Sequence, residues 1–283
     1  MTFKHIITQL ESLPPLSNTP FIIQQIYSVG AQNIDILKLV KVIENDAVLA
    51  ANILRMINAP IYGFSTKIAS ISQAVTLFGT DEIYGLVLKY AVDEQLKADT
   101  DIYGVNNKEF NDICQLQSTL MLQWYSKIDI RHAQFLAPLA LIMESGKLVL
   151  ANEVMKSNYI KKFTLGYKNT KYVSEFEHSL LGTTTYYLSG LLFEYWKLEP
   201  LYVEILKGLD FEDNYSPKIA SFIDSLDVVR TAVNPKNALT KDSIKEAAEL
   251  VEDIGLEPEH FVKVASRVRE QYNKILINRM RKK

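Results

Sequence analysis

The chain has 283 residues, of which 48% are hydrophobic and 23% are charged, a composition typical of a globular protein with a substantial core. Its 31 basic and 33 acidic residues give a net charge of -2, which supplies no general attraction to nucleic acid or to a membrane surface. The single cysteine, Cys114, excludes an intrachain disulfide and a metal site built from several cysteines. We expect it to be a small buried hydrophobic residue.

The N-terminal residues contain no uninterrupted apolar core of the signal-peptide type. The longest apolar run, residues 135–143, is too short to span a bilayer and includes Pro138. We therefore expect a cytoplasmic protein without membrane insertion.

Apolar residues at helical spacing predict three short helices in the first part of the chain, over residues 2–12, from Pro20 onward and over residues 36–44. Residues 47–57 are apolar or small at nearly every position, so we expect a helix that is surrounded by protein on all sides. The sequence Asn58-Ala59-Pro60 ends this helix.

A short helix over residues 72–78 is expected to end at Gly79, before a long helix over residues 81–98. Residues 99–107 form a predicted loop and our candidate boundary between subdomains. Residues 159–172 are basic and are interrupted by Gly166, and we interpret them as an exposed loop. The remaining segments with helical periodicity are residues 109–127, 131–156, 175–181, 183–196, 200–209, 217–233, 240–254 and 258–283.

Within residues 131–156, Pro138 and Gly146 are expected to kink or divide the helix. No alternation of period two is found, so we predict an all-α fold. The predicted organisation is an N-terminal helical subdomain (residues 1–98), a second helical subdomain (105–235) and a C-terminal helical extension (236–283).

Three motifs in a fixed order carry a family resemblance. They are LPPLS at residues 13–17, ENDAVLAANILRMINAP at 44–60 and SISQAVTLFG at 70–79. This order and spacing resembles the HDOD domain, over roughly residues 13 to 230. The resemblance implies a multi-helical bundle related to the HD phosphohydrolases, in a bacterial signalling protein that usually lacks their metal ligands.

HD enzymes bind metal ions through a histidine, a consecutive His-Asp pair and a later aspartate, and the metal generates a hydroxide nucleophile. Each of these ligand positions has a corresponding residue in this sequence, as does a histidine that is sometimes found in the next helix of the family. They fall on Gln117, Met143, Glu144, Thr185 and Asp224, with Asp227 as the alternative to Asp224. Because an amide, a thioether and a hydroxyl replace the imidazoles, the resemblance implies no catalytic residue, no metal and no cofactor.

Glu144 and Asp224 could still hold a hard cation such as magnesium, although acidic pairs are more often solvated or paired with a base. No two of the four histidines have the i, i+4 spacing of a helical metal clamp. The basic residues within 267–283 suit a last helical turn and a tail better than an RNA, an acidic partner or a membrane surface.

These observations favour a non-enzymatic signalling module that binds a signalling protein, as the HDOD resemblance implies, with motility or chemotaxis as the associated processes. The alternative is a sensor that keeps the degenerate cleft, with Gln117 and Glu144, as a pocket for a small molecule or a nucleotide. Residual metal-dependent phosphohydrolase activity is the third hypothesis.

Overall fold

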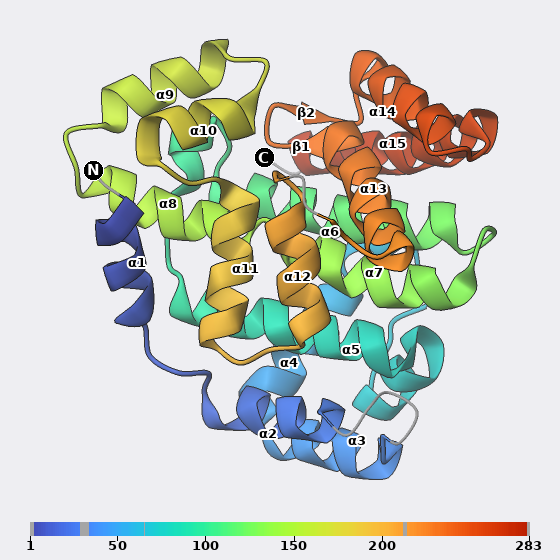
Figure 1. The fold of residues 1–283 in the computed structure, drawn as a ribbon. Coiled ribbons are helices and arrows are strands. Elements are labelled where there is room, and N and C mark those ends of the chain that lie inside the picture. The colour runs from blue at the N-terminus through green and yellow to red at the C-terminus, as the bar shows by residue number, and fades with distance from the viewer. Residues whose placement is uncertain (1–2, 29–33, 65, 212–213, 282–283) are drawn as a thin grey trace.

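Helices make up most of the computed structural model, which describes residues 3–28, 34–64, 66–211 and 214–281 (Figure 1). The predicted all-α class is confirmed. The N-terminal helices are α1 (Phe3–Glu11), α2 (Asn18–Tyr27), α3 (Ile36–Asn45), α4 (Ala47–Ile57) and α5 (Ile71–Gln95). Two short 3-10 helices follow α4 and α5, namely η2 (Pro60–Tyr62) and η3 (Thr100–Tyr103).

From residue 107 onward, the residues that the structure describes form ten further helices. They are α6 (Asn107–Tyr125), α7 (Ile130–Ile142), α8 (Ser145–Met155), α9 (Ile160–Asn169), α10 (Val173–Leu181), α11 (Thr185–Tyr195), α12 (Pro200–Gly208), α13 (Pro217–Ala232), α14 (Lys241–Asp253) and α15 (Pro258–Met280). A two-residue hairpin between α13 and α14 pairs β1 (Val233–Asn234) with β2 (Asn237–Ala238) in antiparallel fashion. This hairpin was not predicted, because strands of two residues are too short to show alternation in the sequence.

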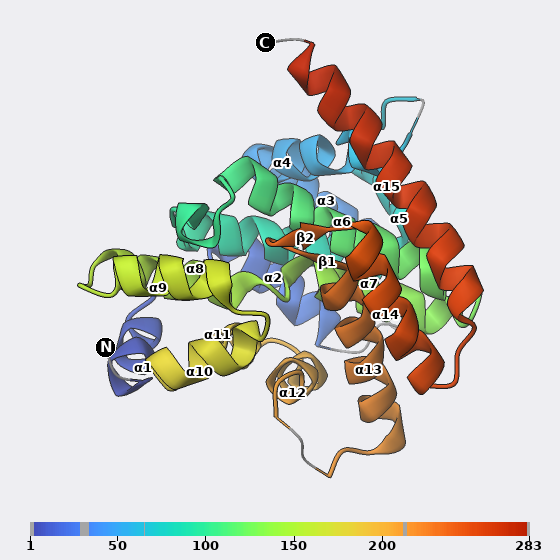
Figure 2. The same ribbon diagram turned by 90° about the horizontal axis from the view of Figure 1, so that it is seen from above.

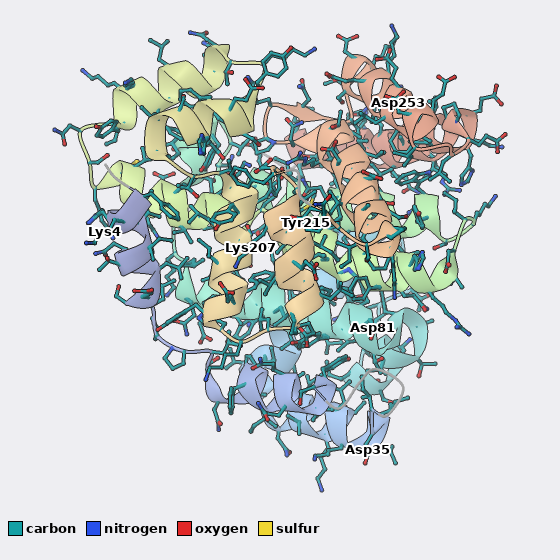
Figure 3. The ribbon with its side chains drawn as sticks, viewed as in Figure 1. Lys4, Asp35, Asp81, Lys207, Tyr215 and Asp253 are labelled. Atoms are coloured by element: carbon teal, nitrogen blue, oxygen red, sulfur yellow. The ribbon has the colours of Figure 1, made fainter. Side chains whose placement is uncertain are left out.

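The centre of the molecule is formed by α7, which packs along both α5 and α6. Around them, α11 packs against α8 and α12, α15 lies along α6, and α2 to α4 close the other end (Figures 1 and 2). Charged side chains such as Lys4, Asp35 and Asp253 lie at the periphery (Figure 3). The core inside is mainly apolar, and the charged residues buried in it therefore need an explanation.

Several helix ends follow from the sequence. Asp46 accepts a hydrogen bond from the backbone of Leu49 at the start of α4, and Ser216 caps α13 before Pro217. Gly79 interrupts α5 with φ of 81°, which confirms the predicted break between its two parts. Gly255 has φ of 76° after α14, the left-handed conformation in which glycine is favoured at the end of a helix.

Residues 159–172 are not the exposed loop that we predicted, because residues 160–169 form α9. Phe163 and Tyr167 are one helical turn apart and both are buried, where they contact the ring of Tyr103 at centroid distances of 5.5 and 5.1 Å. Gly166 gives the ring of Phe176 room against the helix. The two buried aromatic residues stand among four lysines in this segment, and that apolar pattern was too sparse to predict a packed helix.

The prediction that α4 is enclosed on all sides was also wrong. Its buried residues, Leu49, Ile53 and Ile57, lie on one face, whereas Val48 is 62% exposed. Residues 131–156 are divided as expected, but the break falls at Met143 and Glu144 rather than at Pro138, which lies inside α7. Residues 130–155 are long and apolar enough to be a candidate membrane span, yet 89% of the most apolar window is buried within the bundle.

Candidate functional site

The end of α7, the start of α8 and the start of α11 carry residues that correspond to metal-ligand positions of the HD enzymes, and α6 carries one more. Gln117 lies in the middle of α6, Met143 and Glu144 join α7 to α8, and Thr185 begins α11. The approach of α8 to α11 depends on Gly146, because a Cβ atom there would lie 1.9 Å from the carbonyl oxygen of Thr185.

Ser189 joins the same two helices. Its hydroxyl accepts a hydrogen bond from the backbone N–H of Gly146 at 2.8 Å and donates to the carbonyl oxygen of Met143 at 2.7 Å. The backbone around Glu144 is thus held rigidly, and the Glu144 side chain is directed into the protein interior.

The Glu144 carboxylate is fully buried and is engaged at both oxygens. Oε2 lies 2.7 Å from the ammonium Nζ of Lys147. Oε1 accepts hydrogen bonds from Gln117 Nε2 at 2.9 Å and from the Tyr186 hydroxyl at 3.0 Å. The Gln117 amide also donates to the carbonyl oxygen of Val233 in the hairpin, at 2.8 Å. All of these partners come from the chain itself. Within the described residues, Glu144 Oε2 has the Lys147 ion pair but no hydrogen bond, and the carbonyl oxygen of the Gln117 side chain is buried without a hydrogen-bond partner.

Lys147 supplies the positive charge at the centre of this network, although its side chain is only 3% exposed. Its ammonium lies 5.2 and 5.6 Å from the ring centroids of Tyr186 and Tyr103, a favourable arrangement for a cation. Burial alone would lower the pKa of Lys147, but the carboxylates of Glu144 and Glu177 outweigh it and raise the pKa. Lys147 is therefore a charged ammonium throughout the physiological range.

Glu177 of α10 extends the network on the other side of Lys147. It accepts hydrogen bonds from the backbone N–H and the hydroxyl of Thr185 at 2.7 and 2.9 Å, while Lys147 Nζ donates to that hydroxyl at 3.3 Å. Burial raises the pKa of Glu177 to about 7, against the opposing effect of Lys147. Thr185 thus connects the lysine to a second buried carboxyl group.

A second ion pair adjoins the first across Tyr186. The guanidinium of Arg230 lies 4.6 Å from the Tyr186 ring centroid and binds Asp210 at 2.7 Å and Asp227 at 2.5 Å. Asp227, the alternative candidate ligand, is therefore committed to Arg230. Asp224 lies elsewhere, in the lining of a cavity of about 250 Å³ between α13 and the end of α14.

The HD phosphohydrolases, which the HDOD family resembles, hold their metal ions at the corresponding positions, and the donor set of this chain does not fit a metal. Glu144 already binds an ammonium, and the groups nearest to it are the donor amide of Gln117 and the hydroxyl of Tyr186. Within residues 3–28, 34–64, 66–211 and 214–281, no three His, Cys, Asp or Glu side chains are grouped so as to hold a metal ion. A divalent cation here would also face the charge of Lys147.

Four side chains of this network were not predicted from the sequence, namely Lys147, Glu177, Tyr186 and Arg230. One signal was available. Between residues 133 and 152, Glu144 and Lys147 are the only charged residues, and they are three positions apart in an otherwise apolar stretch. Buried opposite charges at that spacing predict an ion pair within one turn.

A further buried carboxyl, that of Glu82 in α5, accepts a hydrogen bond from the Ser118 hydroxyl at 3.2 Å. Burial raises the pKa of Glu82 from 4.5 to about 7. The unfolded chain releases this proton near pH 4.5 and the folded chain only near pH 7. The folded state therefore binds more protons between these values, and its stability falls as the pH rises through that window.

We expect the Glu82→Gln variant to lose this penalty. Its stability relative to the wild type should increase by about 2–3 kcal/mol between pH 4 and pH 8, because the amide cannot ionise. Urea denaturation at both pH values measures this, with Glu44→Gln on the exposed part of α3 as the control. A difference between wild type and Glu82→Gln that is the same at both pH values would contradict the assignment.

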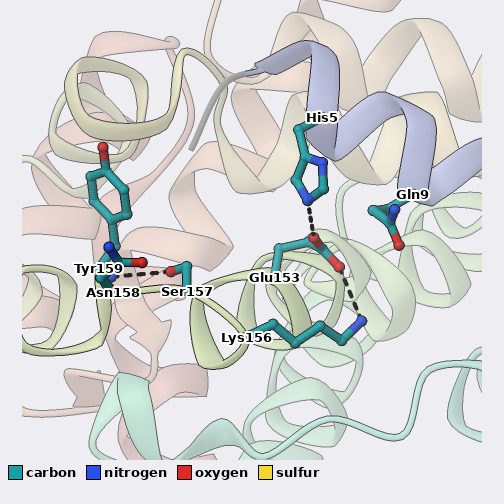
Figure 4. Close-up of a pocket in the computed structure, with 7 residues that line it drawn as sticks. All are labelled: His5, Gln9, Glu153, Lys156, Ser157, Asn158 and Tyr159. Atoms are coloured by element: carbon teal, nitrogen blue, oxygen red, sulfur yellow. Dashed lines mark hydrogen bonds and ion pairs between the residues drawn. The ribbon is translucent and has the colours of Figure 1, made fainter.

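A larger cavity, of about 490 Å³, lies between α1 and the end of α8 (Figure 4). Glu153 is one of the residues that line it and is paired with His5 at 3.1 Å and with Lys156 at 3.3 Å. Neither this cavity nor the one at Asp224 is lined by Gln117, Glu144 or Thr185, which are at most 1% exposed.

The bundle and its buried centre define an all-α protein of the HD-like class. The family model of the HDOD domain matches residues 13–208, and the chain belongs to this family. A search of curated proteins found no match.

Solved structures share the fold at low sequence identity. A protein of Shewanella amazonensis SB2B, provisionally named a phosphohydrolase, aligns with a TM-score of 0.72 and 15% identity over 94% of both chains. A protein of Marinobacter aquaeolei VT8, provisionally named a signal transduction protein, aligns with a TM-score of 0.70 and 21% identity over 94% of this chain and 59% of that one. An HDOD domain protein of Geobacter sulfurreducens aligns with a TM-score of 0.65 and 13% identity over 95% and 96%.

Proposed function

We propose that this HDOD protein is a non-enzymatic, cytoplasmic signalling module of a bacterium that acts by binding a protein partner. The observation that carries the proposal is the buried Lys147–Glu144 ion pair at 2.7 Å. The Lys147 ammonium pairs with the Glu144 carboxylate, which the family resemblance assigns to a metal-ligand position.

Breaking the Glu144–Lys147 ion pair would be energetically unfavourable. Releasing Glu144 to bind a metal would leave Lys147 buried and unpaired, which costs several kcal/mol. The carboxylate would also lose its hydrogen bonds from Gln117 and Tyr186. Since the family is one of signal transduction, a function that needs no open site agrees best with this arrangement, and regulation of motility or chemotaxis remains the process that we favour.

The sensor alternative needs a ligand pocket at the same positions. Gln117, Glu144 and Thr185 are closed off from solvent, so a nucleotide would first have to displace the Lys147 ion pair. A thermal-shift panel of nucleotides, including cyclic di-GMP, tests this alternative. Stabilisation that rises with nucleotide concentration would support it over the protein-binding proposal.

The proposal itself is tested by partner capture. The full chain, fixed at one end to a resin, should retain the same protein from native lysate in replicate experiments, and purified partner should then bind it with a measurable Kd. Repeated capture without a specific partner would count against the proposal.

A further inference from the structure

The outer face of α9 differs from the rest of the surface in charge. Residues 154–174 contain five lysines and no acidic residue, whereas the remainder of the chain has 26 basic and 33 acidic residues. Two of the five lysines are paired, Lys156 with Glu153 and Lys171 with Glu246, both at 3.3 Å. In the part of the chain that the structure describes, Lys161, Lys162 and Lys168 are exposed and have no ion-pair partner.

An apolar side chain lies among these lysines. Leu165 is 63% exposed, and it follows Lys161 by four positions and precedes Lys168 by three. The three residues therefore share one face of the helix. A leucine flanked by cations on an exposed helical face has no role in the packing of the bundle.

The opposite face of α9 holds the helix firmly in place. Phe163 and Tyr167 are buried against Tyr103, whose ring also lies beside Lys147. At the end of the helix, Lys236 of the hairpin donates hydrogen bonds to the carbonyl oxygens of Tyr167, at 3.0 Å, and of Thr170. The helix lies at the edge of the molecule in both views (Figures 1 and 2), so its outer face is presented rigidly to solvent.

We propose that this face of α9, formed by Lys161, Lys162, Leu165 and Lys168, binds an acidic segment of a partner protein. The inference rests on the proposed function and names the surface that would perform it. The lysines attract and orient an acidic partner, and Leu165 packs against an apolar side chain between its carboxylates.

The same residues suit other polyanions less well. Residues 154–174 contain no arginine, which is the preferred residue for bidentate contact with phosphate. Tyr172 is the only exposed aromatic residue among them, whereas binding of single-stranded nucleic acid relies on bases stacked on several aromatic side chains. A membrane surface would require several large apolar residues on one helical face, and the α9 face offers one.

A defined probe tests the proposal. A fluorescently labelled helical peptide, with a leucine stripe flanked by glutamates, is titrated with the full chain and followed by anisotropy at low and at physiological salt. We expect the K161E/K168E variant to bind at least about tenfold more weakly than the wild type, and Leu165→Ala to bind a few-fold more weakly. The matched control K38E/K41E changes the net charge by the same amount, on two exposed lysines of α3 at the far end of the molecule in Figure 1. We expect this control to bind the peptide as the wild type does.

Three results would overturn the proposal. They are no binding of the peptide by the wild type, equal loss in both charge-reversal variants, and binding of single-stranded RNA or of phosphatidylserine vesicles through α9 in preference to the peptide. Far-UV circular dichroism checks that the variants are folded. Metal-dependent hydrolysis by the chain would remove the proposed function without changing these affinities, so the two failures can be told apart.

Discussion

Replacement of Lys147 by methionine is expected to lower the free energy of unfolding by about 3–5 kcal/mol, because it leaves a buried carboxylate without its counter-charge. The methionine side chain has nearly the shape of the lysine stem, so the loss reports the charge rather than a cavity. Glu144 and Lys147 are 0% and 3% exposed, and solvent cannot substitute for the missing ammonium. Urea denaturation at neutral pH measures the effect.

Two controls separate the ion pair from the general effect of removing a lysine. The double variant K147M/E144Q should recover part of the loss, because the remaining amide is neutral and still has Gln117 and Tyr186 as hydrogen-bond partners. Lys245→Met removes an exposed pair with Glu249 and should cost less than about 1 kcal/mol. If Lys147→Met were no more destabilising than Lys245→Met, the ion pair would not hold the site together.

Substitution of Gly146 by alanine should be the second most damaging change, with a loss of about 3 kcal/mol or more. The added methyl group would meet the backbone carbonyl of Thr185 at 1.9 Å and the backbone nitrogen of Ser189 at 3.0 Å. Neither neighbour is a flexible side chain, so α8 and α11 would have to separate. Thermal unfolding followed by circular dichroism measures the loss.

Gly104→Ala provides the matched control for this substitution. Gly104 has φ of 76°, and a Cβ atom there would have open space around it, so only backbone strain of about 1–2 kcal/mol is expected. If both alanine variants were destabilised equally, close helix contact at Gly146 would not be the cause.

The fold could be predicted from the sequence wherever a local signal and the global packing agree. The break at Gly79, the cap at Ser216 and the helix end at Gly255 each depend on the chemistry of one or two residues. The prediction failed for α9, since its helical state depends on the contact of Phe163 and Tyr167 with a distant segment. Such tertiary contacts leave little trace in local composition.

The candidate site was predicted in part. The family resemblance placed Gln117, Glu144 and Thr185 at what the structure shows to be one connected network, but Asp224 lies apart from it. The groups that give this network its chemistry come from elements far apart in the sequence, such as Glu177 of α10 and the Val233 carbonyl. Their meeting depends on the packing of α8 against α11, which no local pattern reveals.

The most direct test of this account is the metal content of the protein, purified without chelator, together with phosphodiesterase assays in manganese, magnesium and iron. If the ammonium of Lys147 takes the place of a metal ion, the protein should contain far less than one metal ion per chain and should show no turnover. Near-stoichiometric metal with hydrolysis would contradict the account, because Glu144 would then have to exchange Lys147 for the ion.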